Sequence, residues 1–100
     1  MKKKITLEEF WKSEKTICIH CDTLEKANIL SKALDKMGKK WINGAFYTED
    51  NKWNCYKEKT IYYNYGLYDN INHAKEKGYT IYEFEEVDLE SAGSLHGGKV

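Results

Sequence analysis

The sequence predicts one small α+β domain with a βαββαβ-like (ferredoxin-like) plait, in which helices cover one face of a mainly antiparallel sheet. Three observations predict this fold. The 100 residues suffice for one hydrophobic core and not for two. A strand and a helix follow each other in residues 16–38, and a short helix and a strand in residues 69–84. Short β-type segments separated by turn residues lie between these two units.

A short helix is expected before the plait. Thr6 and Glu9 have the spacing of a capping box, in which the threonine accepts a backbone N–H and the glutamate reaches back to the threonine N–H. The apolar residues that follow recur at three- and four-residue steps: Leu7, Phe10 and Trp11. We expect a helix to about residue 13 that packs its apolar stripe on the domain.

The strand and helix of residues 16–38 come next. Residues 16–21 are mostly apolar and β-branched, and Asp22-Thr23 is a natural N-cap. One helical face is then traced by Leu24, Ala27, Ile29, Leu30, Ala33, Leu34 and Met37. Gly38 is placed to end this helix in a left-handed conformation.

Two to four short strands are expected between residues 39 and 65. Asn43-Gly44 is a two-residue hairpin signal, because both residues tolerate positive φ, so residues 39–42 and 45–48 are predicted to pair. Residues 49–52 read as a second turn. Residues 60–65 are aromatic and β-branched, which predicts a further strand.

The last helix and strand complete the plait. Asp69 is expected to cap a short helix through Lys77, with Ile71 and Ala74 facing inward and Gly78 ending it. Residues 79–84 form the last predicted strand. We assign residues 1–90 to the domain and expect residues 91–100 to be a disordered tail, because they have no core-forming pattern.

Composition limits the classes of partner. The formal net charge is zero, and all sixteen basic residues are lysines, so neither a strong positive field nor an arginine fork is available for nucleic acid. A nucleic-acid-binding module remains an alternative. No stretch of about twenty apolar residues exists, which argues against a membrane partner and a signal peptide and predicts a cytoplasmic protein.

The cysteines raise the question of metal binding or catalysis. Cys18 and Cys21 have CxxC spacing, but on a strand residues three apart point to opposite faces, so we expect no metal site. The interpretation we favour is that they act as small apolar residues. Cys18 and His20 share a strand face, which leaves a small Cys-His enzyme as an alternative. We predict no catalytic residue and no cofactor.

Aromatic residues are dense in the middle of the chain, and they suggest a binding surface. Tyr62 is expected on the sheet face opposite to Ile61 and Tyr63, where a tyrosine can stack on a base or anchor a protein interface. The simpler interpretation is that tyrosine only serves as a strand former. The predicted ligand-binding residues are His20, Lys39, Lys40, Trp53, Tyr56, Tyr62 and Tyr68.

Several segments give the chain a family resemblance. They are Ile19-His20-Cys21-Asp22-Thr23, the GKKW run from Gly38 to Trp41, Gly44, Thr60-Ile61-Tyr62-Tyr63, and Gly78-Tyr79-Thr80-Ile81-Tyr82-Glu83-Phe84. On these residues, roughly positions 5 to 87, the chain resembles small accessory proteins encoded by phages and prophages of low-GC Gram-positive bacteria.

The resemblance implies a role and a location, and it assigns no catalytic residue. Small phage accessory proteins often act on host machinery or host defence by binding, which implies counter-defence in the host cell cytoplasm. The expected partner is a host protein or a nucleotide-like small molecule, such as a nucleotide-derived immune signal. A homo-oligomer is a further possibility.

Overall fold

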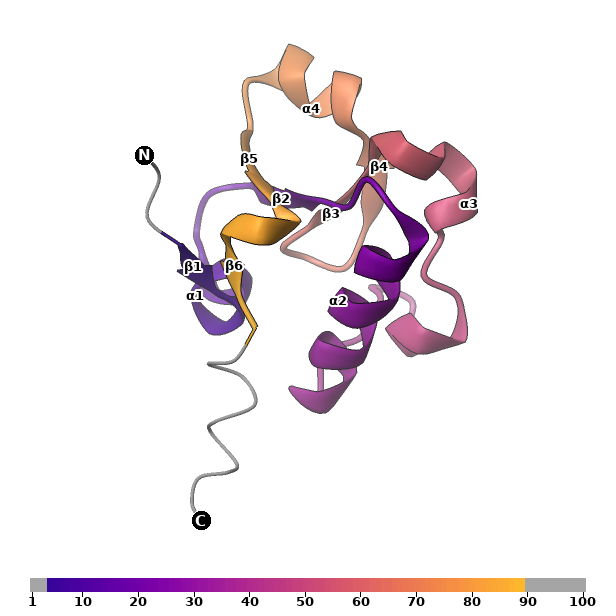
Figure 1. Ribbon diagram of the computed structural model, residues 1–100. Coiled ribbons are helices and arrows are strands. Elements are labelled where there is room, and N and C mark those ends of the chain that lie inside the picture. Colours follow the sequence, from indigo (N-terminus) through magenta and orange to yellow (C-terminus); the bar gives the residue numbers. More distant parts are fainter. Residues whose placement is uncertain (1–3, 90–100) are drawn as a thin grey trace.

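The structure, a computed structural model, describes residues 4–89. It is an α+β fold with a four-stranded mixed sheet of order β4-β3-β2-β5 and a two-stranded parallel sheet of β1 and β6 (Figure 1). The helices are α1 (Leu7–Lys12), α2 (Leu24–Lys36), α3 (Trp53–Tyr56) and α4 (Ile71–Lys77). The strands are β1 (Ile5–Thr6), β2 (Ile17–His20), β3 (Thr60–Tyr63), β4 (Tyr68–Asn70), β5 (Thr80–Glu83) and β6 (Val87–Asp88). The predicted tail, residues 91–100, lies outside the described residues.

The four-stranded sheet is built around β2. This strand pairs antiparallel with β3, with Cys18 opposite Tyr63, and parallel with β5, with Ile17 opposite Thr80. β4 pairs antiparallel with β3 at the other edge. Two of the three strand pairs in this sheet are antiparallel and one is parallel, so the sheet is mixed where a mainly antiparallel sheet was predicted. The ferredoxin-like plait is not confirmed, because β2 lies between β3 and β5 and runs parallel to β5.

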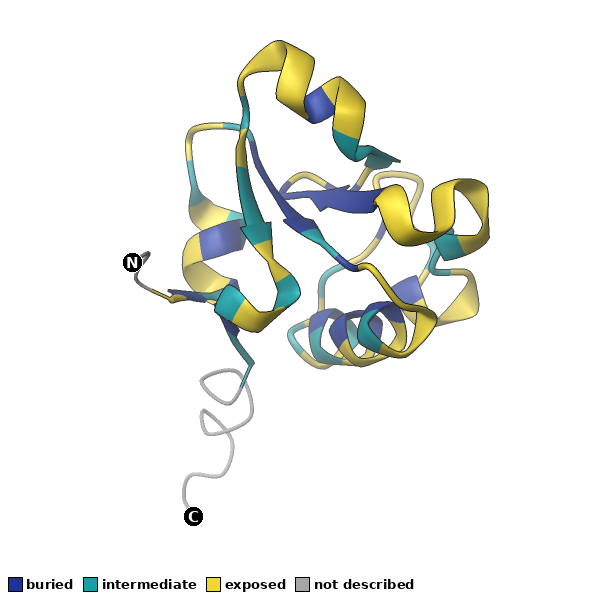
Figure 2. Cartoon of the chain, turned by 45° about the horizontal axis from the view of Figure 1, so that its top comes forward, coloured by how far each residue is buried: buried dark blue, intermediate teal, exposed yellow. Residues whose placement is uncertain are grey.

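The prediction that helices cover one face of the sheet is wrong. α2 packs on the face that carries Ile19 and Tyr62, whereas α4 packs on the opposite face with Ile61 and Tyr63. Figures 1 and 2 show α4 and α2 on either side of the buried strands β2 and β3. The physical reason is that these two strands are apolar at successive positions, so both of their faces need a cover.

The N-terminal helix forms as the capping box predicts. Thr6 Oγ1 accepts the Glu9 N–H at 3.0 Å, and the Glu9 carboxylate accepts the Thr6 N–H at 3.0 Å. Leu7 and Phe10 are fully buried. β1 and β6 flank this helix, a pairing that the sequence did not reveal because each strand has only two residues.

The predicted boundaries of the second helix are also confirmed. The Thr23 side chain accepts the Lys26 N–H, and Gly38 follows the helix with φ +78°. Two residues of the predicted apolar face, Leu24 and Ile29, are nevertheless exposed, at 44% and 42%.

The predicted hairpin around Asn43-Gly44 is a turn without flanking strands. Gly44 has φ +92°, and the Trp41 N–H donates to the Ala45 carbonyl oxygen. The strand pairing does not continue, because the Asp35 carboxylate accepts hydrogen bonds from the N–H groups of Tyr47 and Thr48. A 3-10 helix (Tyr47–Glu49) begins at this point.

The α4 helix begins one residue later than predicted. Asn70 is its N-cap and accepts the Asn72 N–H, whereas Asp69 belongs to the unpredicted strand β4. Gly78 ends the helix with φ +75°, as predicted, and the strand predicted at 79–84 is β5.

Candidate functional site

Aromatic rings form a continuous cluster around Trp41. The ring centroid of Trp41 lies 4.3 Å from that of Tyr47, 6.0 Å from that of Tyr62 and 5.8 Å from that of Tyr68. Trp41 and Tyr47 are buried, at 6% and 1% exposed. This cluster therefore fills the core between α2 and the sheet, and most of it is closed to a ligand.

Tyr62 and Trp53 are two predicted ligand residues that the structure uses internally. Tyr62 lies on the face opposite to Tyr63, as predicted, but α2 covers that face and Tyr62 is only 1% exposed. Its hydroxyl donates to the Asn51 carbonyl oxygen at 2.7 Å. The Trp53 indole N–H donates to the Cys21 carbonyl oxygen at 3.0 Å. An exposed aromatic platform at Tyr62 does not form.

Among the predicted aromatic residues, Tyr56 is exposed and packs beside Tyr68, which is half-buried against the core. Their ring centroids are 6.0 Å apart, and Tyr56 is 39% exposed. The Tyr68 hydroxyl lies 3.5 Å from the Cys55 sulfur, and this hydrogen bond, followed by partial burial, raises the pKa of Tyr68 to about 12. The pair offers a small stacking surface.

The two predicted lysines lie over aromatic rings. The Lys39 ammonium is 5.5 Å from the ring centroid of Trp11, and the Lys40 ammonium is 4.8 Å from that of Phe46. Neither Trp11 nor Phe46 is among the predicted ligand residues. The predicted residues are thus distributed over several surfaces.

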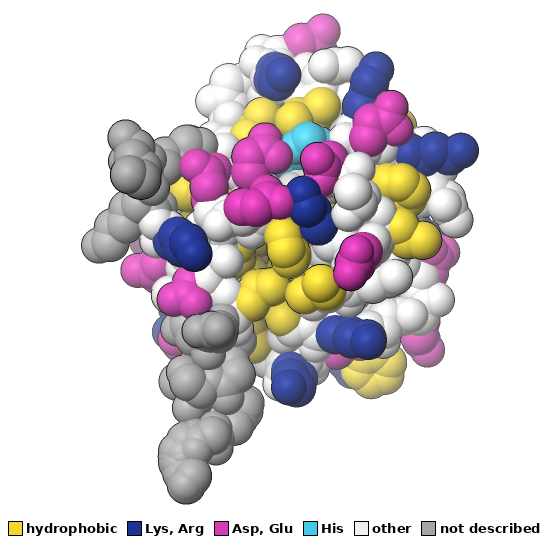
Figure 3. Space-filling model, in the orientation of Figure 1, with side chains coloured by type: hydrophobic (Ala, Val, Ile, Leu, Met, Phe, Trp, Pro, Cys, Tyr) yellow, Lys and Arg dark blue, Asp and Glu magenta, His cyan; other side chains and the backbone are white. Residues whose placement is uncertain are grey.

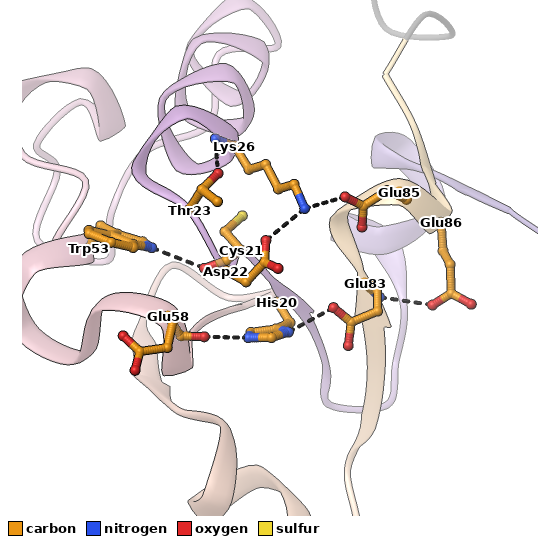
Figure 4. A network of polar contacts seen from close by, with 10 residues as sticks. All are labelled: His20, Cys21, Asp22, Thr23, Lys26, Trp53, Glu58, Glu83, Glu85 and Glu86. Carbon is orange, nitrogen blue, oxygen red and sulfur yellow. Dashed lines mark hydrogen bonds and ion pairs between the residues drawn. The ribbon is translucent and has the colours of Figure 1, made fainter.

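His20 joins three segments of the chain (Figure 4). Its Nδ1 atom is 2.7 Å from the Glu83 carboxylate at the end of β5. Its Nε2 atom is 2.7 Å from the Glu58 carbonyl oxygen in the 3-10 helix Lys57–Lys59. Both ring nitrogens are engaged and the side chain is only 13% exposed, so the geometry favours a structural role.

Lys26 forms the centre of a neighbouring group of charges. Its ammonium pairs with Asp22 at 2.7 Å and with Glu85. The hydrogen bond to Lys26 holds the pKa of each carboxyl below its usual range, and the same two bonds raise the pKa of Lys26. Figure 3 shows acidic side chains gathered around a histidine on this face, above an apolar area between α2 and β6.

A second polar cluster lies on the α4 face and was not predicted. Asp69 Oδ2 accepts the Tyr63 hydroxyl at 2.8 Å and contacts His73 Nδ1. Burial acts to raise the pKa of Asp69, but the hydrogen bonds from His73, the Asn70 backbone and Tyr63 together lower it. The i, i+4 spacing of Asp69 and His73 was the available sequence signal.

The cysteines behave as the strand geometry predicts. Cys18 lies in the core under α4, whereas Cys21 lies in the core under α2, and both are fully buried. Burial raises the pKa of Cys18 to about 12 and raises the pKa of Cys21 as well. Both thiols are therefore protonated near neutral pH and are poor nucleophiles.

Cavities and metal sites give no further candidate. A shallow hollow of about 280 Å³ is lined by Lys4, Ile5, Glu9 and Tyr82, and none of the predicted ligand residues lines it. Within residues 4–89, no group of three or more His, Cys, Asp or Glu side chains is placed to hold a metal ion. No helix in that part of the chain is long and apolar enough to cross a membrane.

Comparisons with protein-family models, with curated proteins and with solved structures found no match to this chain.

Proposed function

We propose that this chain is a non-enzymatic binding protein of phage origin that acts in counter-defence by inhibiting a host protein. The resemblance to phage and prophage accessory proteins supplies the biological context. The observation that carries the binding role is the exposure of apolar side chains on loops: Ile42 is 69% exposed and Phe46 is 46% exposed. Exposed apolar patches commonly mark interaction sites.

The state of the chemically reactive groups supports binding over catalysis. Cys18 is buried and its pKa is raised to about 12, so it is a weak nucleophile near neutral pH. His20 has both ring nitrogens engaged, with Glu83 and with the Glu58 carbonyl oxygen. The Cys-His enzyme would need a thiolate and a free histidine nitrogen, so it is the weaker hypothesis.

A plating assay tests the proposal. The chain is expressed in bacterial strains that carry different defence systems, and the plating efficiency of a phage that each system restricts is measured. We expect the wild-type chain to raise plating on at least one strain. Ile42→Asp is expected to abolish this effect, whereas Leu24→Asp, a matched change at an exposed leucine on α2, retains it.

Two outcomes would contradict the proposal. Unchanged plating on every defended strain would rule out counter-defence in those systems. Equal activity of the Ile42→Asp and Leu24→Asp variants would rule out the loop surface as the binding site. Thermal unfolding of both purified variants shows whether each one is folded.

A nucleotide-derived signal is the second candidate ligand, and the exposed ring of Tyr56 beside the half-buried ring of Tyr68 favours it. Base stacking on an aromatic ring contributes about 1–3 kcal/mol per base. Calorimetric titration of the purified chain with a cyclic dinucleotide tests this candidate directly. Binding of the dinucleotide that is weakened by Tyr56→Ala would support sequestration. A titration without a heat of binding would exclude this dinucleotide as the ligand.

A further inference from the structure

Exposed apolar side chains lie on two loops that are joined to each other. Ile42 and Phe46 belong to the loop of residues 41–46, and Leu67, which is 38% exposed, belongs to the loop of residues 64–67. The Ile42 N–H donates to the Gly66 carbonyl oxygen at 3.0 Å, which joins the two loops. We call Ile42, Phe46 and Leu67 the loop patch.

The backbone beneath the loop patch is well held. Gly66 has φ +86°, and a Cβ atom at this position would lie 2.8 Å from the Ile42 nitrogen, so the loops are in close contact. Trp41, next to Ile42, is buried, and its indole N–H donates to the Asp50 carbonyl oxygen at 3.0 Å. Preorganised loops lose little conformational entropy on binding, which favours a docking surface.

Three lysines lie at the end of α2 and in the segment that leads into the loop patch, and the Lys40 ammonium contacts the patch directly. Lys40 lies over the Phe46 ring, Lys39 follows the α2 helix, and Lys36 is in its last turn. None of these three lysines takes part in an ion pair among residues 4–89. Their positive charge is therefore available to a partner.

The acidic residues nearest to the loop patch in the sequence already form local hydrogen bonds or an ion pair. Asp35 accepts the N–H groups of Tyr47 and Thr48, and Glu49 accepts the Phe46 N–H at 3.1 Å. Asp50 pairs with Lys52 at 3.1 Å. The charge of Asp50 is balanced by Lys52, and the three lysines that are unpaired within residues 4–89 outnumber Asp35 and Glu49, which leaves a small excess of positive charge beside the apolar side chains. Complementary charge on the partner increases the rate and specificity of association.

We propose that the loop patch docks a protein segment in which apolar residues are flanked by acidic side chains. This inference rests on the proposed function, because it names the chemistry of the host partner. Ile42 and Leu67 supply the apolar contact, and Lys39 and Lys40 pair with the acidic flanks. A second copy of this chain and an anionic membrane are the other possible occupants, and the test separates them.

The test uses two synthetic amphipathic peptides with the same leucines, one with glutamate and one with lysine at the polar positions. Affinities for the full chain are measured by fluorescence anisotropy, and contacts are mapped by NMR amide shifts. We expect the glutamate peptide to bind about tenfold more tightly at low salt, a difference of about 1.4 kcal/mol. The preference should decrease as salt is raised. The amide shifts should centre on Ile42 and Leu67.

Matched variants separate the apolar and charged contributions. The double change Lys39→Glu with Lys40→Glu should remove the preference for the glutamate peptide. The same reversal at Lys75 and Lys77, exposed residues of α4, should leave it unchanged. Ile42→Asp should lower the affinity of the chain for both peptides, whereas Leu24→Asp should leave both affinities unchanged.

Several results would overturn the inference. They are equal affinity for the two peptides, no binding of either one, or NMR shifts centred away from the loop patch. Concentration-dependent self-association that Ile42→Asp abolishes would assign the patch to a second copy. Binding to anionic vesicles with no preference between the peptides would assign it to a membrane. Peptide binding as expected, without any plating effect, would support the docking surface and contradict counter-defence in the systems tested.

Discussion

Tyr47 and Tyr62 are both about 1% exposed, but their hydroxyl groups differ in hydrogen bonding. The Tyr62 hydroxyl donates to the Asn51 carbonyl oxygen, whereas the Tyr47 hydroxyl has no partner among residues 4–89. Tyr62→Phe should lower the free energy of unfolding by about 1 kcal/mol, because it leaves a carbonyl without its donor. Tyr47→Phe should be neutral or stabilising, because it removes a buried hydroxyl that forms no bond.

Urea denaturation of both variants followed by tryptophan fluorescence measures this difference. Each variant is the control for the other, because the chemical change and the burial are the same. A loss of more than about 1 kcal/mol in Tyr47→Phe would show that its hydroxyl has a hydrogen-bond partner after all.

Asp69 predicts a pH dependence of stability. Its pKa is lowered in the folded state, so the carboxylate contributes stability that is present above its unfolded-state pKa of about 3.9 and is lost as the pH falls through the lower folded-state value. Asp69→Asn removes this contribution. The free energy of unfolding of the wild type should exceed that of the variant by about 1.5–3 kcal/mol at pH 5, and this difference should decrease below about pH 4.

Urea denaturation at a series of pH values from about 5 downward provides the measurement for this prediction. The matched control is Glu76→Gln, the same carboxylate-to-amide change at an exposed residue of α4. A gap between wild type and Asp69→Asn that stays constant to the lowest pH would mean that the hydrogen bonds from Tyr63 and His73 do not depend on the carboxylate charge.

Two glycines provide a test at the level of the loops. Gly66 and Gly44 both have positive φ, +86° and +92°, so alanine is strained at either position. An added Cβ has open space at Gly44, but at Gly66 it lies 2.8 Å from the Ile42 nitrogen. Gly44→Ala should cost about 1–2 kcal/mol of stability from the backbone alone, and Gly66→Ala should cost clearly more.

Thermal and urea denaturation of the two variants measure the costs, and amide hydrogen exchange at Ile42 reports the bond between the loops. Faster exchange at Ile42 is expected in Gly66→Ala and not in Gly44→Ala. Equal stability losses would mean that the 41–46 loop moves aside freely, which would also weaken the case for a preorganised loop patch.

Elements with local signals were predictable from the sequence, and elements that depend on distant partners were not. The capping box at Thr6 and the stop at Gly38 act within a few residues, and both formed as predicted. The hairpin at Asn43-Gly44 has the expected turn, but the flanking strands do not form, because the N–H groups of Tyr47 and Thr48 donate to the Asp35 carboxylate. No local sequence pattern indicates this contact. β1 and β6 are separated by more than eighty residues in the sequence, so their pairing could not be predicted from a local pattern either.

At the scale of the whole molecule, the alternation of side chains was predictable and the covering of each sheet face was not. The pattern placed Tyr62 and Tyr63 on opposite faces, which the structure confirms. Only the fold shows that α2 covers the Tyr62 face, so the predicted aromatic platform is part of the core. The predicted lysines and Tyr56 remain at the surface because they lie outside that covered face.

A fold with two cores on opposite faces of one sheet predicts a specific pattern of mutational coupling. Leu30 and Ile19 belong to the core under α2, whereas Ile61 belongs to the core under α4. Leu30→Ala should cost about 2–5 kcal/mol and each Ile→Val change about 0.5–1.5 kcal/mol. In the double variant of Leu30→Ala and Ile61→Val, the stability loss should equal the sum of the two single losses within about 0.5 kcal/mol. In the double variant of Leu30→Ala and Ile19→Val, the loss should deviate from that sum by more, because Ile19 shares a core with Leu30.

Urea denaturation of the single and double variants measures both couplings. The shared strands β2 and β3 should keep unfolding a single transition in every variant, because each core packs on the same two strands. Strong coupling between Leu30→Ala and Ile61→Val would mean that the sheet transmits packing changes between its faces. Two separate transitions would mean that the cores unfold independently, and that the sheet does not unite α2 and α4 in one cooperative unit.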